Sequence, residues 1–389
     1  MSFRKSLNIT SFVLALMIFL YAPSADAQST PGAPKSHSDV LVSTNGEKLI
    51  GHLVQSNDGS VIFHSDIAGD VKINWSKIQT LHTSEQFAVV KKNVKLRRKE
   101  SDGDIPQGTL SVADQKIDVK SSTNAVTQTI PVSDAEYLIN RETFQKNVLD
   151  GAGPLEDWRG AITAGAAIVL ATQKSRTFTG NMSLIRSVPP EDWLNPRNRT
   201  ILNLNAAYGI LTQPQTPKVK TEIYHADAER DEYFTPHVYV FGQVEFDHNF
   251  SQGLRLEQVY GGGIGWTVIK NSNDEFDLKA SLSYVEQQFQ AAAPSENLLG
   301  STFAESYHRK FSRKMLFTEQ LTITPAWNNS NAYSAAGTTS LSMPLYKRLN
   351  FTLGSVDTFL NNPPPGFRKN SFQLTTGVTY ALGKDTATY

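Results

Sequence analysis

The last complete segment of the chain, residues 371–383, alternates without a break between two kinds of side chain. A period of two is that of a β-strand with one apolar face and one small, polar face. Similar segments of about ten residues, separated by turn residues, recur back to Trp158, and this repetition is typical of the wall of a membrane β-barrel. The apolar face would carry Phe372, Leu374, Thr376, Val378, Tyr380 and Leu382, and the other face Gln373, Thr375, Gly377, Thr379, Ala381 and Gly383.

The N-terminus has the three parts of a secretory signal peptide. Arg4 and Lys5 are followed by an apolar run at residues 12–21 and by the small residues Ala25 and Ala27. This order predicts a signal peptide at residues 1–27, cut after Ala27. A retained membrane anchor is the alternative, but the run is shorter than the roughly 20 residues that a spanning helix needs.

Composition narrows the remaining possibilities. No later stretch is apolar enough to be a membrane helix, so a mature chain that enters a bilayer must do so as a closed barrel. The chain has no cysteine, which excludes disulfides and thiolate chemistry. Its formal net charge is zero, and charged residues are sparse, so a nucleic-acid partner is not indicated.

Shifts in composition predict a flexible leader at 28–38, a small periplasmic β-domain at 39–139, a linker at 140–157 and an outer-membrane barrel at 158–389. Within the small domain, a strand pattern beginning at Gly51 returns at Gly108, about 57 residues later. We interpret the domain as two weak SH3-like repeats. Chance similarity is the alternative, because few identities support the repeat.

The only dense basic run lies at residues 91–99. Export and the lack of interleaved aromatic residues argue against a nucleic-acid role, and a solvated hairpin is the favoured interpretation. Contact with anionic lipid headgroups or peptidoglycan is a minor alternative.

The barrel is expected to be all-β, antiparallel and twelve-stranded. Single-chain bacterial barrels use even strand numbers, and an even number puts both barrel ends on one side, beside a periplasmic N-terminal domain. A soluble β-sandwich is the alternative, but many segments are longer than typical sandwich strands. The fourth and eighth strands are the least well defined. The strands are expected at 159–171, 176–186, 200–211, 219–229, 237–247, 253–269, 274–288, 300–309, 315–326, 333–345, 349–360 and 371–383.

Four motifs, in order along the chain, resemble the uncharacterised family known as salt-induced outer membrane proteins. They are DVLVSTNGEKLIGHL at 39–53, AGDVKINWSKI at 68–78, GGGIGW at 261–266 and NNPPPGFRKNSFQLTTGVTY at 361–380. The resemblance implies an outer-membrane barrel after a small periplasmic domain, without an assigned activity. The outer-membrane assembly machinery would be expected to read a terminal aromatic residue, and Tyr380 and Tyr389 are both candidates.

Residues for catalysis or metal binding are few. His225 with Asp227, or Asp247 with His248, would form a histidine–carboxylate pair of the kind that activates water or serine. Charged residues are nevertheless ordinary in a wet barrel interior, so we expect no enzyme, and an outer-membrane hydrolase is the lesser alternative. His52 and His64 have no third ligand, so no metal site and no cofactor are expected.

Two functions stay open for the barrel. Twelve strands enclose more room than side chains fill, which favours a passive or narrow channel for small solutes, although a plugged barrel is the alternative. The second is a structural protein in outer-membrane lipid, whose periplasmic domain holds a partner protein or peptidoglycan. Glu319, on an apolar strand face, marks either a protein contact or an error of register. The expected lumen-lining residues are Asn203, Asn205, Arg255, Glu257, Lys279, Ser281, Gln373 and Thr375.

Overall fold

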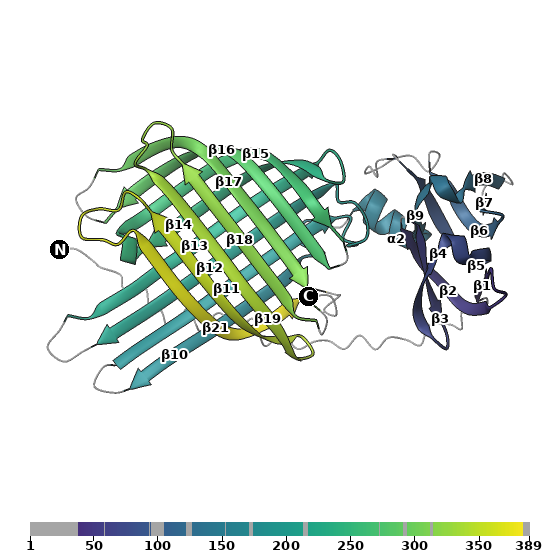
Figure 1. Ribbon diagram of the computed structural model, residues 1–389, viewed down its shortest axis with the longest axis horizontal. Coiled ribbons are helices and arrows are strands. Elements are labelled where there is room, and N and C mark those ends of the chain that lie inside the picture. The colour runs from purple at the N-terminus through teal and green to yellow at the C-terminus, as the bar shows by residue number, and fades with distance from the viewer. Residues whose placement is uncertain are drawn as a thin grey trace.

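The protein has two parts, a small N-terminal β-domain and a long β-barrel, joined by a short helical segment (Figure 1). The computed structural model describes residues 38–57, 59–92, 94, 105–121, 127–151, 153–170, 174–212, 217–271, 273–290, 294–311 and 314–383. The signal peptide, the leader up to residue 37, most of the basic run and the tail 384–389 lie outside these residues. Among the described residues, no helix has the length and apolar character needed to cross a membrane.

The barrel is a closed antiparallel sheet in which each strand pairs with the next along the chain. The last strand pairs with the first, with Gly160 opposite Leu382 and Ala164 opposite Val378, so the sheet has no free edge. The predicted fold class is therefore confirmed, and a sandwich is excluded. The strands are β10 (Arg159–Leu170), β11 (Lys174–Val188), β12 (Asn198–Thr212), β13 (Val219–Tyr233), β14 (Val238–Asn249), β15 (Leu254–Lys270), β16 (Asp274–Phe289), β17 (Glu296–Lys310), β18 (Leu316–Pro325), β19 (Tyr333–Tyr346), β20 (Leu349–Leu360) and β21 (Asn370–Leu382).

The barrel reverses the polarity of a soluble protein. Large apolar side chains such as Leu282 and Leu374 are 65% and 67% exposed on its outer face. Polar side chains on the alternating inner positions are buried, including Arg199 and Asp231. Because a strand turns successive side chains to opposite faces, one sequence pattern builds both surfaces. An apolar exterior around a polar interior is the arrangement of outer-membrane barrels.

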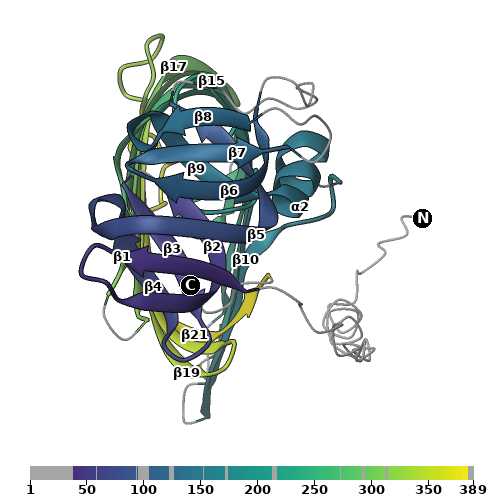
Figure 2. The ribbon, with the colours of Figure 1, turned by 90° about the vertical axis from the view of Figure 1, so that its right-hand side faces the viewer.

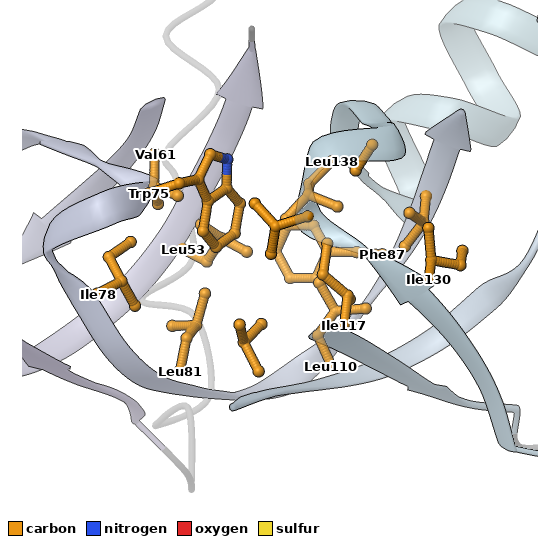
Figure 3. Close-up of a cluster of buried hydrophobic side chains, with 14 of the residues drawn as sticks. Leu53, Val61, Trp75, Ile78, Leu81, Phe87, Leu110, Ile117, Ile130 and Leu138 are labelled. Atoms are coloured by element: carbon orange, nitrogen blue, oxygen red, sulfur yellow. The ribbon is translucent and has the colours of Figure 1, made fainter. Parts of the chain in front are cut away.

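The N-terminal domain is a strongly bent nine-stranded sheet (Figure 2). Its core gathers apolar side chains from both ends of the sheet, with Trp75 beside Leu53 and with Ile117 and Leu138 on the other side (Figure 3). The Trp75 indole donates to Ser56 Oγ at 3.2 Å, which satisfies its buried N–H. The elements are β1 (Asp39–Ser43), β2 (Lys48–Asn57), β3 (Ser60–Ser65), β4 (Gly69–Asn74), η2 (Trp75–Lys77), β5 (Ile78–Lys91), β6 (Gln107–Ala113), β7 (Lys116–Lys120), β8 (Thr127–Pro131), η3 (Val132–Asp134) and β9 (Ala135–Asn140).

The same order of elements occurs twice in this domain. Two hairpin strands and a third strand lead through a 3₁₀ turn into a last strand, as β2–β3–β4–η2–β5 and as β6–β7–β8–η3–β9. Buried residues recur at the same separation, with Leu53 matching Leu110 and Trp75 matching Val132. Both halves nevertheless share one core. The identification of each half as SH3-like stays a prediction.

A short helical connection fixes the domain against the barrel. It consists of α2 (Arg141–Thr143) and the π-helical segment η4 (Phe144–Asp150). Leu194, in the barrel connection between β11 and β12, is 2% exposed and packs into a cluster with Phe144 and Val148. Asn147 donates a hydrogen bond to Glu191, and burial raises the pKa of Glu191 above its ordinary value. The domain therefore lies at the barrel end that carries the chain's entry and exit (Figure 1).

Candidate functional site

Two different walls line the barrel interior. The wall made by β19, β20, β21 and β10 carries small hydroxyl side chains that bond to one another from strand to strand. Thr163 lies 2.7 Å from Thr379, Thr379 lies 2.6 Å from Thr352, and Thr352 lies 2.9 Å from Ser342. The wall made by β12 to β16 instead carries charged side chains, which form two clusters. The charged wall is the candidate functional site.

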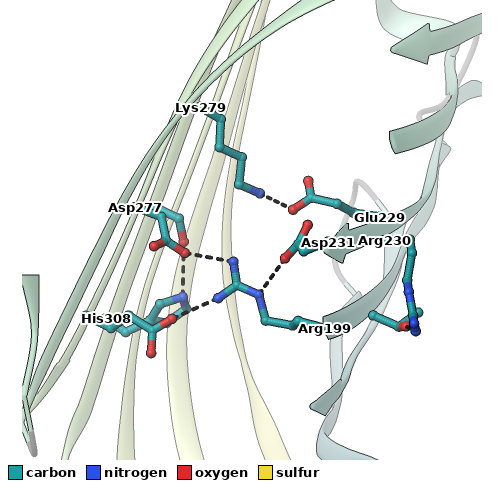
Figure 4. A network of polar contacts seen from close by, with 10 residues as sticks. Arg199, Glu229, Arg230, Asp231, Asp277, Lys279 and His308 are labelled. Atoms are coloured by element: carbon teal, nitrogen blue, oxygen red, sulfur yellow. Dashed lines mark hydrogen bonds and ion pairs between the residues drawn. The ribbon is translucent and has the colours of Figure 1, made fainter. Parts of the chain in front are cut away.

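The first group, the Arg199 cluster, is shown in Figure 4. It lies near the barrel end that faces the N-terminal domain, because Arg199 is at the start of β12, two residues after Arg197, which donates to Val148 O of η4. The Arg199 guanidinium donates to Asp231 Oδ2 at 2.7 Å, to Asp277 Oδ2 at 2.9 Å and to Glu275 Oε1 at 2.9 Å. Lys279 forms a further ion pair with Glu229. Arg199 and Glu229 belong to β12 and β13, whereas their partners on β16 are not sheet neighbours, so these ion pairs span the interior.

Two tyrosines enclose this guanidinium. The Arg199 Cζ atom lies 5.3 Å from the ring centre of Tyr239 and 5.8 Å from that of Tyr233, which is cation–π geometry. Tyr239 is fully buried, and its ring occupies the place that a Cβ of Gly265 would take, 2.1 Å from Tyr239 Cζ. The glycine face of β15 therefore admits a large ring into the interior.

The second group, the His225 cluster, comprises His225, Asp227, Glu245 and Asp247. His225 Nε2 lies 2.9 Å from Asp227 Oδ1, and Nδ1 lies 2.9 Å from Asp247 Oδ1 and 3.9 Å from Glu245 Oε1. In the described part of the chain, the ion pairs of these three carboxylates are all with this one imidazole. The cluster therefore carries a surplus of negative charge.

Strand register explains how the His225 cluster forms. His225 and Asp227 are two residues apart on β13, and Glu245 and Asp247 are two residues apart on β14, so each pair shares a face. The antiparallel register sets His225 opposite Asp247 and Asp227 opposite Glu245. A histidine–x–aspartate beside a glutamate–x–aspartate on paired strands thus makes a four-residue square on the inner wall.

Neighbouring amides hold the carboxylates of this region in place. Asn203 Nδ2 donates to Asp227 Oδ2 at 3.0 Å, and Ser183 Oγ donates to Asn203 Oδ1 at 2.7 Å. Glu257, which is directly opposite Asp247 and 8% exposed, accepts a hydrogen bond from Gln287 Nε2. Asp227 and Glu257 are therefore each held by a neutral amide donor.

The end of the barrel away from the N-terminal domain is narrowed by η5 (Phe250–Gln252), between β14 and β15. Gln252 is 3% exposed, and its amide donates to Thr358 O at 3.0 Å and Lys369 O at 2.8 Å, at the ends of β20 and β21. β14 and β20 lie six strands apart in a ring of twelve, so this contact joins opposite walls.

Seven of the eight residues expected to line the lumen lie on the inner face. Asn203 and Glu257 belong to the surroundings of the His225 cluster, and Lys279 belongs to the Arg199 cluster. Asn205 is directly opposite His225, and Ser281 lies on the β16 part of the charged wall, 3.4 Å from Ser283. On the hydroxyl wall, Gln373 and Thr375 share the face of Thr379.

Arg255 does not line the lumen. A bulge between Leu254 and Leu256 inserts an extra residue into β15, which shifts the faces of the strand at this point. The exposed Arg255 donates to Gln288 Oε1 at 2.8 Å on the outer wall. Alternation alone predicts the inner face here, because a single inserted residue reverses the assignment.

Of the two histidine–carboxylate pairs that the sequence suggested, only one forms in the structure. His225 and Asp227 do meet, but His248 faces outward and lies 2.7 Å from Arg255 O, away from Asp247. In the N-terminal domain, His52 and His64 are cross-strand neighbours, and His64 pairs with Asp70.

Glu319 shares the outer face with Leu321 and Ile323, as their pairing with β17 shows, so its predicted register is correct. A protein contact at this residue stays a prediction.

The sequence prediction of lumen-lining residues omitted most of the charged wall, because β13 carries polar residues on both faces. Its inner positions hold His225, Asp227, Glu229 and Asp231, while Arg230 and Glu232 lie on its outer face. Hydrophobic alternation is weak in such a strand. The signal that identifies it is the period of two in the acidic residues themselves, which extends the strand to Tyr233 rather than residue 229.

Solved structures similar to this chain are also barrels. The translocator domain of autotransporter NalP from Neisseria meningitidis is 10% identical, covers 57% of this chain and 87% of its own, and has a TM-score of 0.30. The NanC porin is 9% identical, with coverages of 58% and 99% and a TM-score of 0.33. The CymD monoaromatic hydrocarbon channel is 9% identical, with coverages of 79% and 89% and a TM-score of 0.27.

No curated protein matches the sequence. A family model does match, over residues 162–382, from the fourth residue of β10 to the end of β21. This match takes in all twelve barrel strands and more than half of the chain. The chain belongs to the family described as "Protein of unknown function, DUF481".

Proposed function

We propose that this protein is a narrow outer-membrane channel that prefers cations. The observation that carries the proposal is the surplus of carboxylates on the charged wall. The Arg199 cluster sets Glu229, Asp231, Glu275 and Asp277 against two cations, and the His225 cluster sets three carboxylates against one imidazole. A surface of one sign concentrates ions of the opposite sign in a confined space.

The shape of the interior supports a narrow path rather than a wide pore. Twelve strands enclose more room than the eight that side chains can fill, and the hydroxyl wall carries mostly small side chains, such as those of Thr163, Thr352 and Thr379. Against this, the Arg199 cluster spans the interior at one end, and Gln252 joins opposite walls at the other. We expect low conductance and slow passage of small polar solutes.

Recordings from the full mature chain in planar bilayers test this function. Under a KCl gradient, the reversal potential is expected to shift towards the equilibrium potential of potassium. Replacing both Glu245→Gln and Glu257→Gln should move it towards zero, because both side chains face the lumen. Glu286→Gln is the matched control, since Glu286 lies on the outer wall beside Gln288 and should change nothing. Absence of any conductance, or a preference for anions, would contradict the proposal.

A structural role is the second candidate, and the docked N-terminal domain favours it. Its sheet ends in the exposed strand β4, and Ile67 beside that strand is 98% exposed. A partner protein or peptidoglycan in the periplasm would have access to this edge. If the bilayer recordings give no current, this role becomes the leading proposal.

Both candidates are non-enzymatic. A periplasmic location of the N-terminal domain, recognition by the assembly machinery and membership among the salt-induced proteins stay predictions.

A further inference from the structure

We propose that the His225 cluster binds one divalent transition-metal ion inside the barrel. His225 Nδ1, Glu245 Oε and Asp247 Oδ would be its protein ligands. Atoms of these three residues lie within 4.8 Å of one another. The sequence pattern alone predicts no metal site, because it does not show that these residues meet. Its consequence for ion passage rests on the proposed channel function, whereas binding itself does not.

The distances fit one coordination sphere. Two ligand atoms that each lie about 2.1 Å from a metal are separated by about 3 Å when at right angles and by about 4 Å when opposite. The Nδ1 atom of His225 lies 2.9 Å from Asp247 Oδ1 and 3.9 Å from Glu245 Oε1. A metal can therefore sit between the imidazole and both carboxylates with little movement of the strands.

The far side of the imidazole is already arranged as metal-binding histidines require. Its Nε2 lies 2.9 Å from Asp227 Oδ1, and a hydrogen bond there keeps a proton on Nε2. Nδ1 faces Asp247 Oδ1 at 2.9 Å, so a metal ion would bind by displacing the proton between these two atoms. Asn203 in turn donates to the other oxygen of Asp227. A carboxylate–histidine–metal arrangement with a supporting amide is thus complete apart from the ion.

Charge and ligand type identify the class of ion. A neutral imidazole with two carboxylates carries two negative charges, which a divalent cation neutralises. These carboxylates have no lysine or arginine partner in the described part of the chain, so their surplus charge otherwise remains in a half-buried wall. Imidazole nitrogen suits zinc, copper, nickel and iron, whereas calcium and magnesium prefer oxygen alone.

Zinc titration of the full mature chain in detergent micelles, followed by calorimetry, tests the site without measuring current. The wild-type protein should bind zinc at least tenfold more tightly than Glu245→Gln, and calcium far more weakly than zinc. Glu245 is the ligand of choice for substitution because its ion pair with His225, at 3.9 Å, is the longest in the cluster, against 2.9 Å for Asp227 and Asp247. His225→Gln should also remove binding, and His248→Gln is the matched control, one residue beyond Asp247 on the outer wall.

A second readout keeps the test valid if a variant folds poorly. Zinc should raise the urea midpoint of the wild-type protein and of His248→Gln, but not that of Glu245→Gln. Equal zinc affinity in the wild type, Glu245→Gln and His225→Gln, or no zinc binding at all, would overturn the site and leave His225 as an ion-pair partner. If the protein binds zinc but passes no current, the metal site is supported and the channel function is contradicted. If it passes current but binds no zinc, the channel function is supported and the metal site is contradicted.

Discussion

At the scale of single residues, the large side chain of Tyr239 fits inside the barrel because its neighbour on the next strand, Gly265, has no side chain. Tyr239 is fully buried and lies 4.8 Å from the ring centre of Tyr233 and 6.3 Å from that of Phe241. Its ring crosses the inner wall at Gly265 on the neighbouring strand. Because two rings and the guanidinium of Arg199 lie against it, any movement of the tyrosine would disturb these contacts.

Gly265→Ala should therefore destabilise the barrel. Its new Cβ would lie 2.1 Å from Tyr239 Cζ, and overpacking of this kind costs about 1–3 kcal/mol. Gly262→Ala is the control, because Gly262 faces outward on the same strand and its Cβ would meet only Phe241 O, at 3.4 Å. Urea unfolding in detergent micelles measures both free energies. Equal stability of the two variants would show that Tyr239 moves aside without cost.

Sequence alternation predicts many inner residues correctly and fails at one identifiable kind of place. Asn203, Glu257 and Lys279 are placed on the lumen side by a period of two alone, since the strands keep their register over long stretches. Arg255 is misplaced by one bulge, which alternation cannot reveal. The pairing of His225 with Asp247 also needs the register between strands, which a single sequence does not contain.

At the scale of elements, β12 and β13 carry charged side chains on both faces, buried on the inner face and exposed on the outer face. The inner face of the pair carries Arg199 and Asp231, with side chains 6% and 0% exposed. The outer face carries Arg230 and Glu232, with side chains 46% and 55% exposed. The two ion pairs thus have similar lengths, 2.7 Å and 2.9 Å, but opposite surroundings. The poor hydrophobic alternation of β13 follows from this arrangement.

Arg199→Met should be strongly destabilising, whereas Arg230→Met should not. Removing Arg199 leaves Asp231 and Asp277 buried without their cation, a change that costs about 3–5 kcal/mol. An exposed ion pair such as that of Arg230 contributes about 0–1 kcal/mol. Urea unfolding monitored by tryptophan fluorescence compares the two.

A double variant, Arg199→Met with Asp231→Asn, separates the charge effect from packing. It should recover part of the lost stability, because one uncompensated carboxylate is removed. No recovery would mean that Arg199 acts mainly through its contacts with the rings of Tyr233 and Tyr239.

At the scale of the whole molecule, the barrel and the N-terminal domain share part of a core. Trp193 and Leu194 come from the connection between β11 and β12, yet Leu194 packs with Phe144, and the Trp193 ring lies 5.9 Å from that of Tyr137. Arg197 donates to Val148 O at 3.0 Å across the same contact. The sequence divides the chain into these parts but cannot show this contact, since a tryptophan and a leucine in a turn have no periodic signal.

Leu194→Ala should loosen the N-terminal domain although the substituted residue belongs to the barrel. Removing a buried leucine side chain costs about 2–5 kcal/mol, and here the cavity would open beneath η4. Hydrogen exchange should therefore accelerate in η4 and β9, while the strands of the barrel keep their protection. Leu155→Ala is the control, because Leu155, in the segment between η4 and β10, is 89% exposed. Unchanged exchange in η4 and β9 would mean that the two parts fold independently, and the domain would then be free to move from the end of the barrel.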